Sequence, residues 1–165
     1  MTHEDAGHYA GKRHGAELNE MIAVRIKEKI SENTISCAEA HSIAVKLNVD
    51  PPDVGTAIDL LEVRINKCQL GLFGYGKQKN IPALSDNVNP EIESAIKSSL
   101  VNGRLTCSAA WDISKRFNVS KAMVAAACET MKVKISACQL GAFRKSARGK
   151  SVRKQGGINK LASRD

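Results

Sequence analysis

The motif Cys68-Gln69-Leu70-Gly71 recurs 70 residues later as Cys138-Gln139-Leu140-Gly141 and reveals an internal duplication. Aligned on this motif without a gap, residues 22–73 and 92–143 are identical at 17 of 52 positions. Two diverged copies act as an internal control, because the fold requires what both retain, and separate tasks can arise where they differ. A chain of 165 residues containing two such units is expected to form two small domains packed against each other.

Apolar residues at helical spacing come before the motif in both copies. Ile22, Ile26 and Ile30 predict an amphipathic helix, and the equivalent positions 92, 96 and 100 are also apolar. With 42% hydrophobic but only 4% aromatic residues, the cores are expected to be aliphatic and modest in size.

A second helix is predicted by its start and stop signals. Ser36 and Glu39 have the spacing of a capping box, and Thr106 is the equivalent cap in the second copy. The apolar stripe that follows ends at Asn48 and Asn118, and Asn readily adopts the left-handed conformation that ends a helix. Each copy therefore turns sharply after this helix.

A third helix begins almost at once. Asp50 is placed to cap it with Pro51 at its first position, and Ser120 is the equivalent cap in the second copy. The alternating apolar residues 63 and 65 then predict a short strand.

The shared motif itself is explained most simply by geometry. Gly71 and Gly141 permit a tight turn, and we expect Phe73 and Phe143 to close the core. The alternative, a cofactor site in the glycine-rich residues 71–76, matches no phosphate-binding spacing. No cofactor is therefore expected.

The spacing across the second and third helices resembles that of the DNA-binding helix-turn-helix, in which a small residue is followed after four positions by the turn and after six more by Val. The residues that carry the resemblance are Ala44, Asn48 and Val54 in the first copy and Ser114, Asn118 and Val124 in the second. A preceding helix and a following strand with a Gly turn are similar to the winged variety, over residues 20–76 and 90–154. The resemblance implies a mainly α fold with short β-strands, built as two tandem winged-helix-like three-helix domains.

Positive charge is concentrated at the end of the chain. Residues 1–75 carry a net charge of −3, residues 76–90 of +1, residues 91–143 of +3 and residues 144–165 of +7. The last segment mixes Lys and Arg with Gly and Ser, so it can neutralise phosphates but cannot build a core. The open alternative is a basic segment that only aids solubility.

The resemblance suggests a DNA interface in the second copy, with the basic segment as its wing and Gly149 turning a hairpin over residues 144–154. The third helix there is slim but lacks Arg, Asn and Gln for bidentate base reading, so contacts should go mainly to the phosphate backbone. The expected contact residues are Lys115, Arg116, Ser120, Lys121, Arg144, Lys145, Arg148, Lys150, Arg153 and Lys154.

The third helix of the first copy has no basic residue. Asp53 and Asp59 lie within it and Glu62 follows it, so we expect it to repel phosphates. Its role is then either to face a protein partner or another subunit, or purely structural.

Four of the five cysteines are paired by the repeat. Burial as small apolar fillers is the simpler interpretation. The alternative is a thiol switch or soft-metal site formed by Cys37 and Cys68, with His41 as a further ligand and the helix N-terminus lowering the pKa of Cys37. The histidines at positions 3, 8 and 14 have no fourth partner at fixed spacing, so no metal site is expected there.

The predicted organisation is a flexible leader (1–17), a first repeat (18–76), a linker (77–90), a second repeat (91–143) and a basic wing or tail (144–165). No nucleophile, base or P-loop pattern indicates an enzyme, and no apolar run or export signal indicates a membrane or secreted protein. We expect a cytoplasmic DNA-binding transcriptional regulator. The alternative is a protein interaction adaptor that keeps the fold without binding DNA and could also sense thiols or metal.

Overall fold

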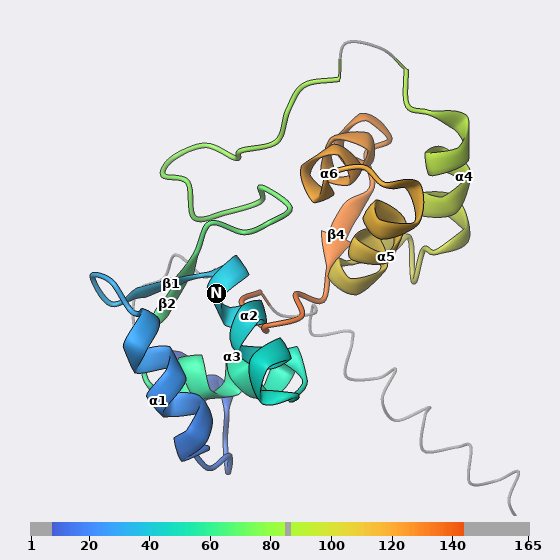
Figure 1. Ribbon diagram of the computed structural model, residues 1–165. Coiled ribbons are helices and arrows are strands. Elements are labelled where there is room, and N and C mark those ends of the chain that lie inside the picture. The colour runs from blue at the N-terminus through green and yellow to red at the C-terminus, as the bar shows by residue number, and fades with distance from the viewer. Residues whose placement is uncertain (1–7, 85–86, 144–165) are drawn as a thin grey trace, which may run out of the picture.

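The computed structural model describes residues 8–84 and 87–143, which form a mainly helical chain in two similar halves (Figure 1). The first half contains η1 (Tyr9–Lys12), α1 (Glu20–Lys29), β1 (Thr34–Ser36), α2 (Cys37–Leu47), α3 (Pro51–Leu60) and β2 (Arg64–Asn66). The second half contains α4 (Pro90–Ser98), β3 (Arg104–Thr106), α5 (Cys107–Phe117), α6 (Lys121–Thr130) and β4 (Lys134–Ser136). None of the described helices combines the length and apolar character needed to cross a bilayer.

Most of the predicted helix signals are confirmed. Ser36 and Glu39 form the capping box at the start of α2, and the Thr106 and Ser120 side chains accept hydrogen bonds at the starts of α5 and α6. Asn48 and Asn118 take left-handed conformations with φ of 54° and 53°. The Asp50 side chain makes no capping hydrogen bond, so α3 begins on its prolines alone.

Each half contains one short sheet of two parallel strands. Ile35 in β1 pairs with Ile65 in β2, and Leu105 in β3 pairs with Ile135 in β4. The strand near Ile65 was predicted, but its parallel partner before the second helix was not. These parallel pairs differ from a hairpin wing, which needs antiparallel strands. The hairpin that we expected over residues 144–154 lies outside the described residues.

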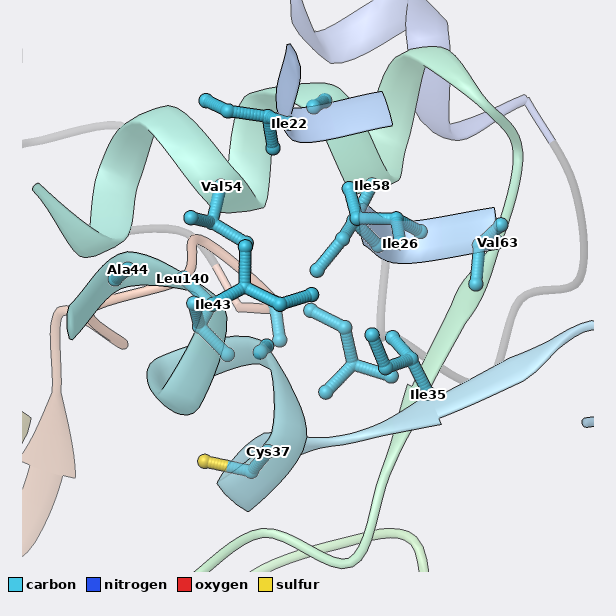
Figure 2. Close-up of a cluster of buried hydrophobic side chains, with 14 residues drawn as sticks. Ile22, Ile26, Ile35, Cys37, Ile43, Ala44, Val54, Ile58, Val63 and Leu140 are labelled. Atoms are coloured by element: carbon cyan, nitrogen blue, oxygen red, sulfur yellow. The ribbon is translucent and has the colours of Figure 1, made fainter. Parts of the chain in front are cut away.

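The two halves exchange their Gln-Leu-Gly turns. Leu140, from the second half, is 1% exposed and lies in the core of the first half among residues such as Ile43 and Val54 (Figure 2). Leu70, from the first half, is equally buried in the core of the second half. We call residues 68–73 and 138–143 the exchanged loops. Each core is therefore completed by the other copy.

Equivalent residues of the two halves meet where the loops cross. The rings of Phe73 and Phe143 lie edge to face with centroids 6.2 Å apart, and those of His41 and Trp111 are 4.2 Å apart. Contacts between equivalent positions are the mark of an approximate twofold axis. Phe73 packs against both cores, and the exchanged leucines are the more deeply buried residues of the motif.

The turn geometry of the motif is as predicted. Gly71 and Gly141 have φ of 80° and 75°, and each donates its N–H to the carbonyl of the Cys three residues earlier, at 2.8 and 2.9 Å. A residue with a side chain is strained at such a φ.

Candidate nucleic-acid interface and the junction of the halves

Helix α6, the expected groove-binding helix of the second half, is buried on most of its surface. The five consecutive residues from Val124 to Cys128 are each at most 3% exposed. A helix that is apolar on all sides belongs to a core. The small side chains that suggested close entry into a groove instead pack inside the protein, where the exchanged Leu70 joins them. Exposed side chains remain only near the ends of α6, at positions such as Met123 and Glu129.

Helix α3 of the first half is covered by the other exchanged loop. A Cβ atom placed on Gly55 would lie 1.9 Å from the carbonyl oxygen of Leu140, so the loop backbone rests directly on the helix. The equivalent residue in α6 is Ala125. The loop of the second half therefore approaches α3 more closely than an alanine at position 55 would allow.

Two acidic side chains of the first half, Asp59 and Glu62, hold the leader. Asp59 in α3 is 1% exposed and pairs with Lys12 Nζ at 3.1 Å and Arg13 Nε at 2.8 Å. Two predictions are corrected here. The leader is ordered against α3 from residue 8 onward, and Asp59 is neutralised, because a buried carboxylate needs a cationic partner. Asp53 remains exposed, as expected.

Glu62 anchors the same segment through the backbone. Its carboxylate oxygens accept hydrogen bonds from the N–H groups of Tyr9 at 2.9 Å and Ala10 at 3.0 Å. These bonds, chiefly that from Ala10, hold the pKa of Glu62 below its usual value of 4.5. Like Asp59, Glu62 already has partners within the chain.

The cations predicted to touch DNA differ in their surroundings. Lys121 is half-buried, with its Nζ 4.4 Å from the ring centroid of Trp111, and Ser120 is exposed and caps α6. Lys115 and Arg116 lie exposed at the C-terminal end of α5 and form no ion pair among the described residues. The other six predicted contacts, Arg144, Lys145, Arg148, Lys150, Arg153 and Lys154, lie outside the described residues.

The exchange of loops also decides where the basic segment begins. Ala142 is 4% exposed within the core of the first half, and Phe143 contacts Phe73. The chain therefore reaches residue 143 at the junction, beside the first half (Figure 1). We had expected residues 144–165 to start as a wing on the second repeat alone.

Four of the five cysteines are buried thiols, and Cys138 is half-buried. Cys37 and Cys107 begin α2 and α5, and their sulfurs face the side-chain amides of Gln69 at 4.0 Å and Gln139 at 3.5 Å. Desolvation outweighs these contacts and raises the pKa of Cys37 to about 12 and of Cys107 to about 11. The prediction of a lowered thiol pKa is therefore wrong. Cys68 packs in the core of the second half and adds to the rise in the pKa of Cys37 across the junction.

The metal-site alternative lacks the necessary geometry. Within residues 8–84 and 87–143, no three His, Cys, Asp or Glu side chains are arranged to hold a metal ion. His41 stacks on Trp111 instead of facing Cys37 as a ligand. Burial, followed by the nearby Lys121, lowers the pKa of His41 to about 4.

The pairing of Lys12 and Arg13 with Asp59 was missed from sequence. The one feature of the sequence that pointed to this pairing was the carboxylate of Asp59 between the apolar positions 58 and 61 of the third helix.

Comparisons with protein-family models, curated proteins and solved structures found no match to this chain.

Proposed function

We propose that this protein is a nucleic-acid-binding regulator that contacts the phosphate backbone and does not read bases. The observation that carries the proposal is the distribution of positive charge. Residues 144–165 carry +7, and Lys115 and Arg116 are exposed at the end of α5. Clustered cations suit a polyanion bound through its charge.

The burial of both third helices argues against base reading. Their exposed residues, such as Asp53 in α3 and Met123 and Glu129 in α6, include no Arg, Asn or Gln. Bidentate hydrogen bonds from those side chains give most of the discrimination in the major groove. The proposed binding is therefore almost independent of sequence, unlike that of a typical helix-turn-helix regulator.

Salt dependence provides the quantitative test. Contacts from the six basic residues between 144 and 154 together with Lys115 and Arg116 would give a slope of log affinity against log salt near −7, at about −0.9 for each phosphate. Affinity for duplex DNA should then fall by roughly 10⁴-fold between 50 and 200 mM salt.

The experiment is fluorescence anisotropy of a labelled random duplex across that salt range. Deletion of residues 144–165 should remove most of the binding and flatten the slope, and Lys115→Ala with Arg116→Ala should lower the slope by about two. The matched control is Lys27→Ala with Lys29→Ala, which removes two exposed cations from α1. Unchanged affinity after the deletion would refute the proposal.

A second candidate, a protein interaction adaptor, is favoured by two exposed apolar side chains of the first half whose equivalents in the second half are charged. Met21 is 70% and Val45 is 80% exposed, whereas the equivalent residues of the second half are Glu91 and Lys115. The fold tolerates polar residues at these positions, so the apolar ones serve something other than folding.

The adaptor candidate is tested by exchanging residues between copies. Met21→Glu with Val45→Lys places second-half residues on the first half, where the same fold accommodates them. Sedimentation equilibrium of the full chain should show self-association that these substitutions weaken. A chain that stays monomeric at every concentration excludes self-association through this surface.

A further inference from the structure

Residues 8–13, which we call the strap, connect α3 to the exchanged loop of the second half. While Lys12 and Arg13 pair with Asp59, Lys12 Nζ also donates to the carbonyl of Gly141 at 3.1 Å, and Arg13 Nη2 donates to that of Leu140 at 3.3 Å. The two cations thus hold the loop and the helix at once. Because the carbonyls belong to the second half, the strap ties that half to the first.

The loop of the first half is held by the linker instead, because Asn80 donates its backbone N–H to the carbonyl of Gly71 at 2.8 Å. On the second half, Glu129 takes the position of Asp59, and its partner is Lys79 in the linker at 2.8 Å. Both side chains of that pair are more than half exposed, whereas the Asp59 side chain is 2% exposed. An exposed ion pair contributes little, because water and salt screen it. The two exchanged loops are therefore held differently although the copies share a fold.

The strap is built from contacts that can open without unfolding the rest of the chain. Of the residues between 8 and 18, only Tyr9 is buried. The remaining anchors are polar: hydrogen bonds to Glu62, and the ion pairs of Lys12 and Arg13 with the buried Asp59 carboxylate. Segments with few buried apolar contacts open locally at much lower cost than the core.

We propose that the strap is a releasable lock on the second half's exchanged loop: docked, it keeps residues 138–143 on α3, and released, it lets that loop leave the first half. Leu140 and Gly141 lose both of their side-chain donors when the strap leaves. Residues 68–73, which the strap does not touch, keep their place in the second half. The inference does not depend on nucleic-acid binding.

Hydrogen exchange measured by mass spectrometry on the full chain tests the lock. In Lys12→Gln with Arg13→Gln, amide exchange in residues 138–143 should become roughly tenfold faster or more, since each lost charged hydrogen bond contributes to protection. Residues 68–73 are the internal control and should exchange as before. A matched control variant is Arg25→Gln with Lys27→Gln, which removes two exposed cations from α1.

A second arm removes the strap without altering its sequence. Deletion of residues 1–17 should give the same local acceleration, and a synthetic peptide of residues 1–17 should reverse it. Trp111, the single tryptophan of the chain, stacks on His41 at the junction, so its quenching by acrylamide should rise on release and fall when the peptide is added. Unchanged exchange in residues 138–143, or equal acceleration in residues 68–73, would overturn the proposal, because the strap would then be either irrelevant to the loop or a general support of the fold.

Discussion

Replacing Gly55 by alanine is expected to destabilise the protein although alanine is the better helix former. In the interior of an exposed helix the exchange of Gly for Ala is favourable by about 1 kcal/mol. At position 55, however, the new methyl group would lie 1.9 Å from the Leu140 carbonyl oxygen and 2.6 Å from its carbon. Both atoms belong to backbone, so a simple side-chain rotation cannot relieve the contact.

The magnitude follows from what the loop gives up when it withdraws. Leu140 is 1% exposed, and full burial of a leucine side chain is favourable by about 1.5–3 kcal/mol. Weakening of the hydrogen bonds from Lys12 and Arg13 to the loop costs about 1–2 kcal/mol more. After the gain in helix propensity is subtracted, Gly55→Ala should lower the free energy of unfolding by about 2–4 kcal/mol.

Urea unfolding, followed by circular dichroism and by Trp111 fluorescence, measures this change. Gly11→Ala is the matched control, since a Cβ at Gly11 meets no atom within 4 Å, and it should leave stability nearly unchanged. If Gly55→Ala instead raises the free energy of unfolding by about 1 kcal/mol, helix propensity alone explains the effect. The exchanged loop then does not lie as close to α3 as described.

Three further predictions concern the junction. Leu140→Ala should cost about 2–5 kcal/mol and unfold both halves in one transition, checked by urea melts with two probes, because this side chain completes the core of the other half. Because the pKa of His41 is lowered to about 4, only the unfolded state binds a proton at this ring between pH 6.5 and about 4. The free energy of unfolding should therefore fall by roughly 1–2 kcal/mol as the pH is lowered across that range, after allowance for solvent screening of the partly exposed ring. His41→Phe should flatten this decline in melts recorded at a series of pH values. Because burial raises the pKa of both thiols, Cys37 and Cys107 should resist iodoacetamide at pH 8 in the native protein and react once it is unfolded, as read by peptide mass spectrometry.

Local structure was largely predictable because its signals lie within a few residues of one another. The capping box at Ser36 and the left-handed Asn48 fix where α2 begins and ends, whatever surrounds them. The positive φ of Gly141 likewise follows from a tight turn. Apolar spacing also identified the buried faces of the helices, such as the one containing Ile22 and Ile26.

The pairing between copies was not predictable in the same way. An apolar period shows that Leu70 and Leu140 will be buried, but not in which of two similar cores. The helices that receive the two leucines are related by duplication, so the sequence offers each leucine two nearly equivalent sites. The close approach of the Leu140 backbone to Gly55 belongs to the exchanged arrangement and is visible only in three dimensions.

The leader was misjudged for a related reason. Composition describes residues 1–17 as polar, and polar segments without an apolar period are usually left without structure in a sequence-based prediction. Its anchors are two charges, Lys12 and Arg13, whose partner Asp59 lies 46 residues further along the chain from Arg13. A long-range ion pair leaves no periodic trace in the sequence. The site residues between 144 and 154 stay a prediction.

The exchange of loops gives the duplication a physical role. In this arrangement each core is completed by a leucine from the other copy. Because both copies lie in one chain, their association does not depend on protein concentration. Within one chain, mutations do not have to suit both sides of a symmetric pair. The difference between Gly55 and its equivalent, Ala125, is an example of such a change in one copy alone.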